Sequence, residues 1–254
     1  MIFDLFRLDN RVALITGATT GLGQAMSVAL AGAGADIVSL GRRPGVETGE
    51  RVNAIGRRFT HVTCDLVTAS VSDLQQVVAQ AVSEMGRLDI LVNNAGIIRR
   101  ATAIEFTESD WDAVIRVNLK AVFFLSQAAA RQMVEQGGGK IIHIASMLSF
   151  QGGILVPAYT AAKSGLAGIT HALANEWAKH NINVNAIAPG YMATDNTAAL
   201  QADPVRNQAI LDRIPAGRWG APDDLAGIVI FLASGASDYM HGAIVPVDGG
   251  WLSR

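Results

Sequence analysis

The chain has 254 residues, half of them hydrophobic and 6% aromatic, with 26 glycines and a formal net charge of −2. The near-neutral charge, without a basic run, argues against nucleic-acid binding, and no uninterrupted apolar run reaches the ~18 residues that a membrane span needs. A single cysteine, Cys64, rules out an internal disulfide and predicts a cytoplasmic location, and the five histidines lack metal-ligand spacing, so we expect no metal site.

Apolar runs and helix-type segments alternate along the chain. The runs that read as strands are 10–16, 35–40, 59–66, 88–94, 140–146, 182–189 and 242–250. The segments that read as helices are 24–33, 71–85, 108–136, 159–180 and 222–234. The strands are continuous apolar runs rather than alternating ones, as in a parallel sheet covered on both faces. We therefore predict one doubly wound, Rossmann-type α/β domain over residues 1–254.

Residues 194–213 break this alternation. The segment is polar and weakly helical, contains Pro204, and follows the end of a predicted strand. Ligands of such sheets bind beyond the carboxyl ends of the strands. We therefore predict a mobile substrate lid, with an ordinary pair of surface helices as the alternative.

Glycines follow the first strand in the pattern G-x-x-x-G-x-G, at Gly17, Gly21 and Gly23, with Thr20 and Leu22 between them. Glycine permits a tight turn and a close approach of backbone to pyrophosphate at the start of a helix. The position between a strand and a helix favours a nucleotide site over a plain loop.

The second strand of such a unit is expected to end on the residue that selects the cofactor, about 20 residues after the turn. Gly41, Arg42 and Arg43 stand there, and no carboxylate is available for a ribose 2′-hydroxyl. Glycine leaves room for a 2′-phosphate, and either arginine could pair with it. NADP is therefore favoured, with NAD as the alternative.

Ser146, Tyr159 and Lys163 form the main candidate for chemistry. Tyr159 and Lys163 are four residues apart, so on a helix they share a face, and Ser146 follows an apolar strand. A phenol has an ordinary pKa near ~10, and a neighbouring cation lowers it. We expect Lys163 to lower the pKa of Tyr159, while Ser146 holds a carbonyl oxygen. The alternative is that the pair are mere neighbours on a solvated helix face.

Together these motifs resemble those of the short-chain dehydrogenase/reductase family. The resemblance covers nearly the whole chain and includes Asn93 to Gly96 (NNAG), Asn118 in the long helix, and Thr194. It implies a sheet of seven parallel strands, a homotetramer, and a catalytic tetrad. The implied tetrad is Asn118, Ser146, Tyr159 and Lys163, with Asn118 holding a water that links Lys163 to solvent.

The resemblance also implies the cofactor contacts. Beside the glycine turn and the residues around Gly41, these are Asp65, Leu66, Asn93, Ala95, Gly96, Tyr159, Lys163, Pro189, Gly190, Met192 and Thr194. Asp65 and Leu66 would flank the adenine, Asn93 would contact the adenosine ribose region, and the segment around Met192 would meet the nicotinamide.

Within the family, the chain most resembles the dehydrogenases of 2-deoxy-D-gluconate and related sugar acids, in stretches such as AGIIRR and IASMLSFQGG. A keto or hydroxy sugar acid needs a cation for its carboxylate, and Arg99 and Arg100 are the candidates by position. Ser149 and Gln151 could bind its hydroxyls, with a loop-capping role as the alternative, and exposure to solvent is the alternative for the two arginines. Gluconate 5-dehydrogenase and 3-oxoacyl carrier-protein reductase are alternatives, and a scaffold without chemistry is disfavoured because the tetrad is complete.

Overall fold

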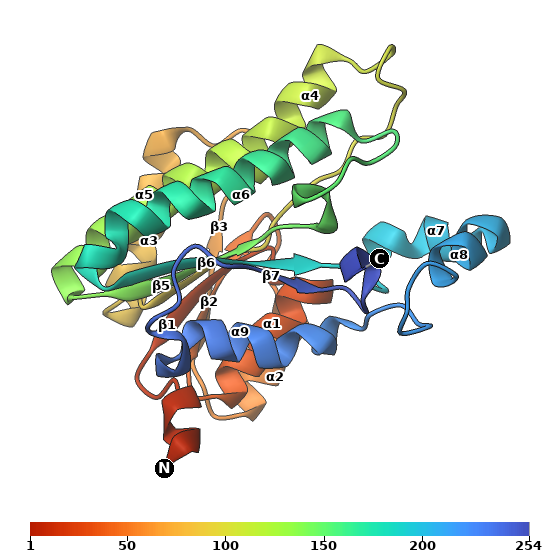
Figure 1. The fold of residues 1–254 in the computed structure, drawn as a ribbon. Helices are drawn as coiled ribbons and strands as arrows, with labels where there is room; N and C mark the ends of the chain where they lie inside the picture. The colour runs from red at the N-terminus through yellow and green to blue at the C-terminus, as the bar shows by residue number, and fades with distance from the viewer. Residues whose placement is uncertain (254) are drawn as a thin grey trace.

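The computed structural model describes residues 1–253, which build a seven-stranded parallel sheet (Figure 1). The strands lie in the order β3-β2-β1-β4-β5-β6-β7, which confirms the predicted doubly wound sheet. They are β1 (Val12–Thr16), β2 (Asp36–Gly41), β3 (Phe59–Thr63), β4 (Ile90–Asn93), β5 (Gly139–Ile144), β6 (Ile182–Pro189) and β7 (Ile244–Val247). The order reverses between β1 and β4, so a ligand crevice is expected at the carboxyl ends of these two strands.

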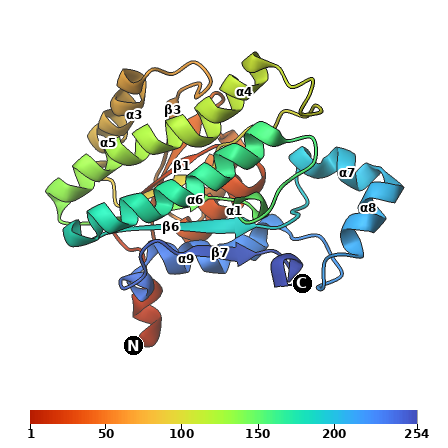
Figure 2. The same cartoon turned by 45° about the horizontal axis from the view of Figure 1, so that its top comes forward.

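Helices cover both faces of the sheet. They are α1 (Gly21–Gly32), α2 (Val46–Ala54), α3 (Val71–Met85), α4 (Glu108–Ile115), α5 (Ala121–Gln136), α6 (Pro157–Trp177), α7 (Ala198–Ala202), α8 (Pro204–Leu211) and α9 (Ala226–Ala233). Figures 1 and 2 show α3, α4, α5 and α6 over one face and α1, α2 and α9 over the other. The pair α7 and α8 lies beyond the carboxyl end of the sheet, apart from both layers.

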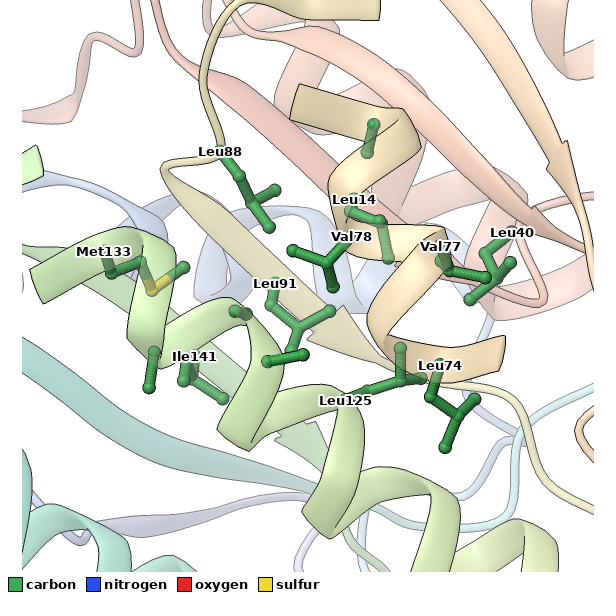
Figure 3. Close-up of a cluster of buried hydrophobic side chains, with 14 of the residues drawn as sticks. Leu14, Leu40, Leu74, Val77, Val78, Leu88, Leu91, Leu125, Met133 and Ile141 are labelled. Atoms are coloured by element: carbon green, nitrogen blue, oxygen red, sulfur yellow. The ribbon is translucent and has the colours of Figure 1, made fainter. Parts of the chain in front are cut away.

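Two apolar clusters hold the layers together. One fills the space between the sheet and helices α3 and α5, with Leu14, Leu91 and Leu125 fully buried in it (Figure 3). The other joins the opposite face to α1 and α9, around Ile15 and Leu30. Burial of apolar surface contributes about 25 cal/mol per Å², so these clusters supply the main free energy that fixes the strand ends in place.

Short 3₁₀ turns complete the chain, and one π-helical turn interrupts the long helix. The 3₁₀ turns are η1 (Ile2–Phe6), η3 (Met147–Ser149), η4 (Ala178–His180), η5 (Asp195–Thr197), η6 (Pro222–Leu225), η7 (Gly235–Ser237) and η8 (Trp251–Ser253). The π turn is η2 (Arg116–Lys120), and it joins α4 to α5 in one continuous helix. By length and composition alone that helix could cross a membrane, but 56% of its apolar window is buried in the fold, as in a core helix.

Helix α2 was not predicted from the sequence. Its N-cap is Gly45, which has no side chain to mark the start, and Val46 at its first position is 64% exposed. Of its three buried residues, Thr48, Gly49 and Val52, only Val52 has a large apolar side chain, and the Thr48 hydroxyl donates to the carbonyl oxygen of Ala18 at 2.9 Å. The helix therefore lacks the apolar stripe on which a prediction depends, and it is tied to the glycine turn by a hydrogen bond.

Candidate active site

The glycine turn adopts a conformation that requires glycine. Gly17 and Gly21 have φ values of +66° and +55°, in the left-handed region. A Cβ on Gly23 would lie 2.6 Å from the side-chain amide nitrogen of Asn94 and closer still to the carbonyl oxygen of Gly17. Thr20 precedes α1 and makes no side-chain capping bond, so no side chain covers the first amides of the helix. Such an uncapped helix start beside a glycine-floored turn fits a pyrophosphate.

The turn after β4 is bonded to the glycine turn. The Thr16 hydroxyl accepts hydrogen bonds from the backbone amides of Asn94 (2.9 Å) and Ala95 (2.8 Å), and the Asn94 side chain donates to the carbonyl oxygens of Thr16 (2.9 Å) and Gly17 (3.1 Å). The role of Thr16 was not predicted from the sequence, whereas Asn94 belongs to the predicted NNAG motif and here caps the strand end. The side chain of Asn93 is buried instead, and donates to the Ser126 hydroxyl at 3.0 Å.

The end of β2 leaves space for a phosphate. A Cβ on Gly41 would meet nothing within 4 Å, and Arg42 and Arg43 after it are exposed. None of the ion pairs recorded within residues 1–253 includes either arginine. Asp36, the acid of this strand, stands at its other end and pairs with two arginines there. Asp65 follows β3, and its carboxylate accepts from the amide of Val67 at 3.0 Å.

The segment that follows β6 covers the glycine turn. Pro189 ends the strand, and a Cβ on Gly190 would lie 2.6 Å from the backbone of Asp248. Met192 is buried and forms a β-bridge with Gly220. The Thr194 side chain lies 3.7 Å from the Cβ position of Gly21. The turns after β1, β4 and β6 therefore meet, which brings most of the predicted cofactor residues together.

Ser146, Tyr159 and Lys163 converge at the end of β5. Ser146 caps η3, where its hydroxyl accepts from the amide of Leu148 at 3.1 Å, and its interaction with the Tyr159 phenol lowers the pKa of that phenol. Helix α6 begins at Pro157, so Tyr159 and Lys163 lie one turn apart. Lys163 is 4% exposed; its Nζ donates to the carbonyl oxygen of Ile144 at 2.5 Å and lies 5.5 Å from the centre of the Tyr159 ring.

The prediction that Lys163 lowers the pKa of the Tyr159 phenol differs from what this structure shows. Burial raises the pKa of Tyr159 to about 12, although the hydrogen bond from Ser146 and the charge of Arg100 lower it in part. Burial also lowers the pKa of Lys163 to about 8. The cost of desolvation therefore dominates both groups. The Lys163 ammonium donates to the Ile144 carbonyl, and Lys163 is not among the groups that lower the phenol pKa.

Asn118 lies inside the π turn and is fully buried. Its side-chain oxygen accepts from the amide of Ile97 at 2.9 Å, and its side-chain nitrogen donates to the carbonyl oxygen of Ile97 at 2.8 Å. A Cβ on Gly96 would lie 3.3 Å from the same oxygen. Asn118 therefore fixes the loop that follows β4. π turns are rare and recur at functional sites, and the helical pattern of the sequence did not reveal this one.

The structure separates the two arginines of that loop. Arg99 Nε lies 3.1 Å from Asp110 Oδ1, so its charge is paired at the surface. Arg100 forms no recorded ion pair within residues 1–253, and its charge acts on the Tyr159 phenol.

Two further residues expected to contact substrate already make protein contacts. The Ser149 hydroxyl donates to the backbone carbonyl of Lys163 at 2.7 Å. The Gln151 side-chain oxygen accepts from Arg213 at 3.3 Å. Ser149 thus anchors η3 to α6, and Gln151 joins the loop after Ser146 to the end of the predicted lid.

Comparison with known proteins adds independent findings. The family model described as short chain dehydrogenase matches residues 11–205. Over the full length of both chains, the sequence is 62% identical to a 2-dehydro-3-deoxy-D-gluconate 5-dehydrogenase of Dickeya dadantii (strain 3937) and 60% identical to one of Escherichia coli (strain K12). The crystal structure of a proposed 2-deoxy-D-gluconate 3-dehydrogenase from Agrobacterium tumefaciens, with bound NADP, is similar with a TM-score of 0.92 and 55% identity, covering 99% of this chain and 100% of that one.

Proposed function

The chain belongs to the short-chain dehydrogenase family, and we propose that it transfers a hydride between NADP(H) and a keto or hydroxy sugar acid of the 2-dehydro-3-deoxy-D-gluconate type. It is an NAD(P)-dependent oxidoreductase that acts on a hydroxyl group. One observation supports the site: Lys163 is buried beside the Tyr159 ring, 5.5 Å from its centre, and Ser146 lowers the pKa of the Tyr159 phenol.

In the proposed mechanism, each side chain has one task. Tyr159 gives its proton to the carbonyl oxygen in reduction and takes it back in oxidation. Ser146 donates a hydrogen bond to the same oxygen as negative charge develops on it. Lys163 holds a cation beneath the phenol, and Asn118 fixes the neighbouring loop through Ile97. The nicotinamide cofactor, when bound, supplies or accepts the hydride.

The proposed cofactor site is built from the three turns that meet at the crevice. Its floor is Gly17, Gly21 and Gly23, and the uncapped start of α1 favours the pyrophosphate. Arg42 and Arg43 are proposed to hold the 2′-phosphate of NADP, because they are exposed beside an open Gly41 and form no ion pair within residues 1–253. NAD would also fit this space but would leave both arginines without a partner.

For the substrate carboxylate, we favour Arg100 over Arg99. The positive charge of Arg100 lowers the pKa of the Tyr159 phenol, whereas Arg99 is paired with Asp110. Residues 194–213 form α7 and α8 beyond the carboxyl end of the sheet, a position that supports the proposed lid.

We further propose a cytoplasmic homotetramer. The continuous helix Glu108–Gln136 and helix α6 form the outermost layer of one face (Figure 1). Trp111 and Val134, both on the continuous helix, are 41% and 44% exposed. Large apolar side chains at such positions suit contact with a second copy of the chain.

A spectrophotometric screen at 340 nm tests this function directly. NADPH and NADH are crossed with 2,5-diketo-3-deoxy-D-gluconate, 5-keto-D-gluconate and a 3-oxoacyl thioester. The account predicts the highest kcat/KM with the deoxy diketo acid and NADPH. The best rate with 5-keto-D-gluconate would make the protein a gluconate 5-dehydrogenase, and the best rate with the thioester would contradict a sugar-acid substrate.

A further inference from the structure

Arg213 is held at the end of the predicted lid by two side-chain contacts. Its guanidinium stacks 4.0 Å from the centre of the Trp251 ring, and Nη2 donates to the Gln151 side-chain oxygen at 3.3 Å. No recorded ion pair within residues 1–253 includes Arg213. A guanidinium has five N–H donors, so most of its donors stay available for a ligand.

The contacts of Arg213 tie it to the loop that follows Ser146 and to the C-terminal turn. Gln151 stands on the loop that begins at Ser146. Trp251 is 5% exposed and packs in one cluster with Met147, the residue after Ser146, and with Ile214, the residue after Arg213. Arg213 therefore connects three segments: the predicted lid, the loop after β5, and the C-terminal turn.

Arg100 approaches the same loop from its other end. The amide of Ala101 donates to the carbonyl oxygen of Leu155 at 3.1 Å, which holds the Arg100 loop against the segment that precedes α6. Arg100 and Arg213, which form no ion pair within residues 1–253, thus approach residues 151–155 in a protein of net charge −2. A crevice lined by charges of one sign concentrates ligands of the opposite sign.

We infer that Arg213 is a second carboxylate-binding residue of the substrate site, carried by the lid and acting together with Arg100. This inference rests on the sugar-acid function proposed above. Stacking on Trp251 orients the planar fork of the guanidinium, which suits a bidentate contact with a carboxylate. Because Arg213 belongs to the lid, an anionic substrate also draws the lid onto the crevice.

Steady-state kinetics with charged and uncharged substrates test this role. The best sugar acid of the screen is compared with its carboxamide, which keeps the carbon chain but lacks the charge. Arg213→Gln should raise KM for the acid by about 10- to 100-fold, the range of a hydrogen bond to a charged group, and change KM for the amide by less than about threefold. Arg213→Lys should give a KM for the acid between those of the wild type and Arg213→Gln, since lysine keeps the charge but not the planar guanidinium. Arg206→Gln is the matched control, because Arg206 is an exposed arginine of α8 without contact to Gln151 or Trp251.

An equal rise in KM for the acid and for the amide would mean that Arg213 only holds the lid in place. An unchanged KM for the acid would also overturn the inference. A calorimetric titration of the NADPH complex with D-gluconate separates this failure from that of the proposed function. Weaker D-gluconate binding by Arg213→Gln, with wild-type affinity in Arg206→Gln, supports the anion site even if the wild type turns over no sugar acid. Turnover of sugar acids by the wild type, with unaltered D-gluconate binding by Arg213→Gln, would leave the enzyme function standing and remove Arg213 from the site.

Discussion

The Lys163 ammonium lies 5.5 Å from the centre of the Tyr159 ring and is fixed there by a 2.5 Å hydrogen bond to the backbone of β5. Tyr159 and Lys163 share a face of α6 because they are four residues apart. The carbonyl of Ile144 in β5 sets the direction of the Lys163 ammonium. The ammonium therefore stands under the ring rather than against the phenol oxygen. As a result, Arg100 and Ser146 are the groups that lower the phenol pKa, and burial opposes them.

Replacing Arg100 with glutamine should move the pH dependence of oxidation to higher pH. The positive charge of Arg100 favours phenolate, so its removal raises the pKa of Tyr159, and the group becomes a base only at higher pH. The measurement is kcat/KM against pH for oxidation of an uncharged polyol, which avoids the carboxylate contact. Arg99→Gln serves as the control, because Asp110 already pairs with that arginine. Identical profiles for wild type and Arg100→Gln would refute the electrostatic link.

Replacing Lys163 with methionine should stabilise the fold below pH 8, and the gain should shrink at higher pH. The folded protein lowers the pKa of Lys163 from 10.5 to about 8, so between these values the unfolded chain binds the proton that the folded chain has lost. Wild-type stability attributable to this group therefore rises with pH, and its full penalty applies below pH 8. The gap between the two pKa values corresponds to on the order of 3 kcal/mol.

Denaturant unfolding of wild type and Lys163→Met at pH 7 and pH 10 measures this difference. Loss of the hydrogen bond to Ile144 offsets part of the gain at every pH, so the change with pH is the diagnostic quantity. Lys179→Met, at an exposed position, should show no such change. A stability difference that stays constant from pH 7 to pH 10 would contradict the buried, partly neutralised ammonium.

A methyl group on Gly23 should damage the nucleotide site. The added Cβ would lie 2.6 Å from the Asn94 amide and even closer to the backbone of Gly17, so the turn must shift. We expect Gly23→Ala to lower the free energy of unfolding by about 1–3 kcal/mol and to weaken NADPH binding at least about tenfold. Gly32→Ala, in the same helix with nothing within 4 Å of its Cβ, should bind NADPH normally. Normal NADPH affinity in Gly23→Ala would exclude the turn as the cofactor floor.

The sequence predicts most of the sheet because continuous apolar runs report burial on both faces, as in β6, where every residue from Ile182 to Pro189 is buried. Helix α2 escaped prediction because it buries one large apolar side chain, Val52, rather than a stripe of them. The π turn escaped because Asn118 sits in a helical pattern that is apolar on either side.

The pKa shifts and the side-chain partners of the site residues could not be predicted from the sequence either. Spacing places Lys163 beside Tyr159 but does not tell where the ammonium points or how strongly both groups are desolvated. The same holds for Arg99 and Arg100, adjacent in sequence, of which one meets Asp110 and the other directs its charge to the phenol. Such differences depend on contacts between distant segments, which no local pattern contains.

The most direct test of the central role of Tyr159 is the rate of NADPH oxidation at 340 nm by Tyr159→Phe, measured with a sugar-acid ketone at saturating cofactor. Phenylalanine keeps the ring above Lys163 and removes only the phenol oxygen. The account predicts wild-type affinity for NADPH and a fall in kcat of at least about 100-fold, the usual contribution of a general acid. A kcat within tenfold of the wild-type value, with NADPH bound normally, would contradict it.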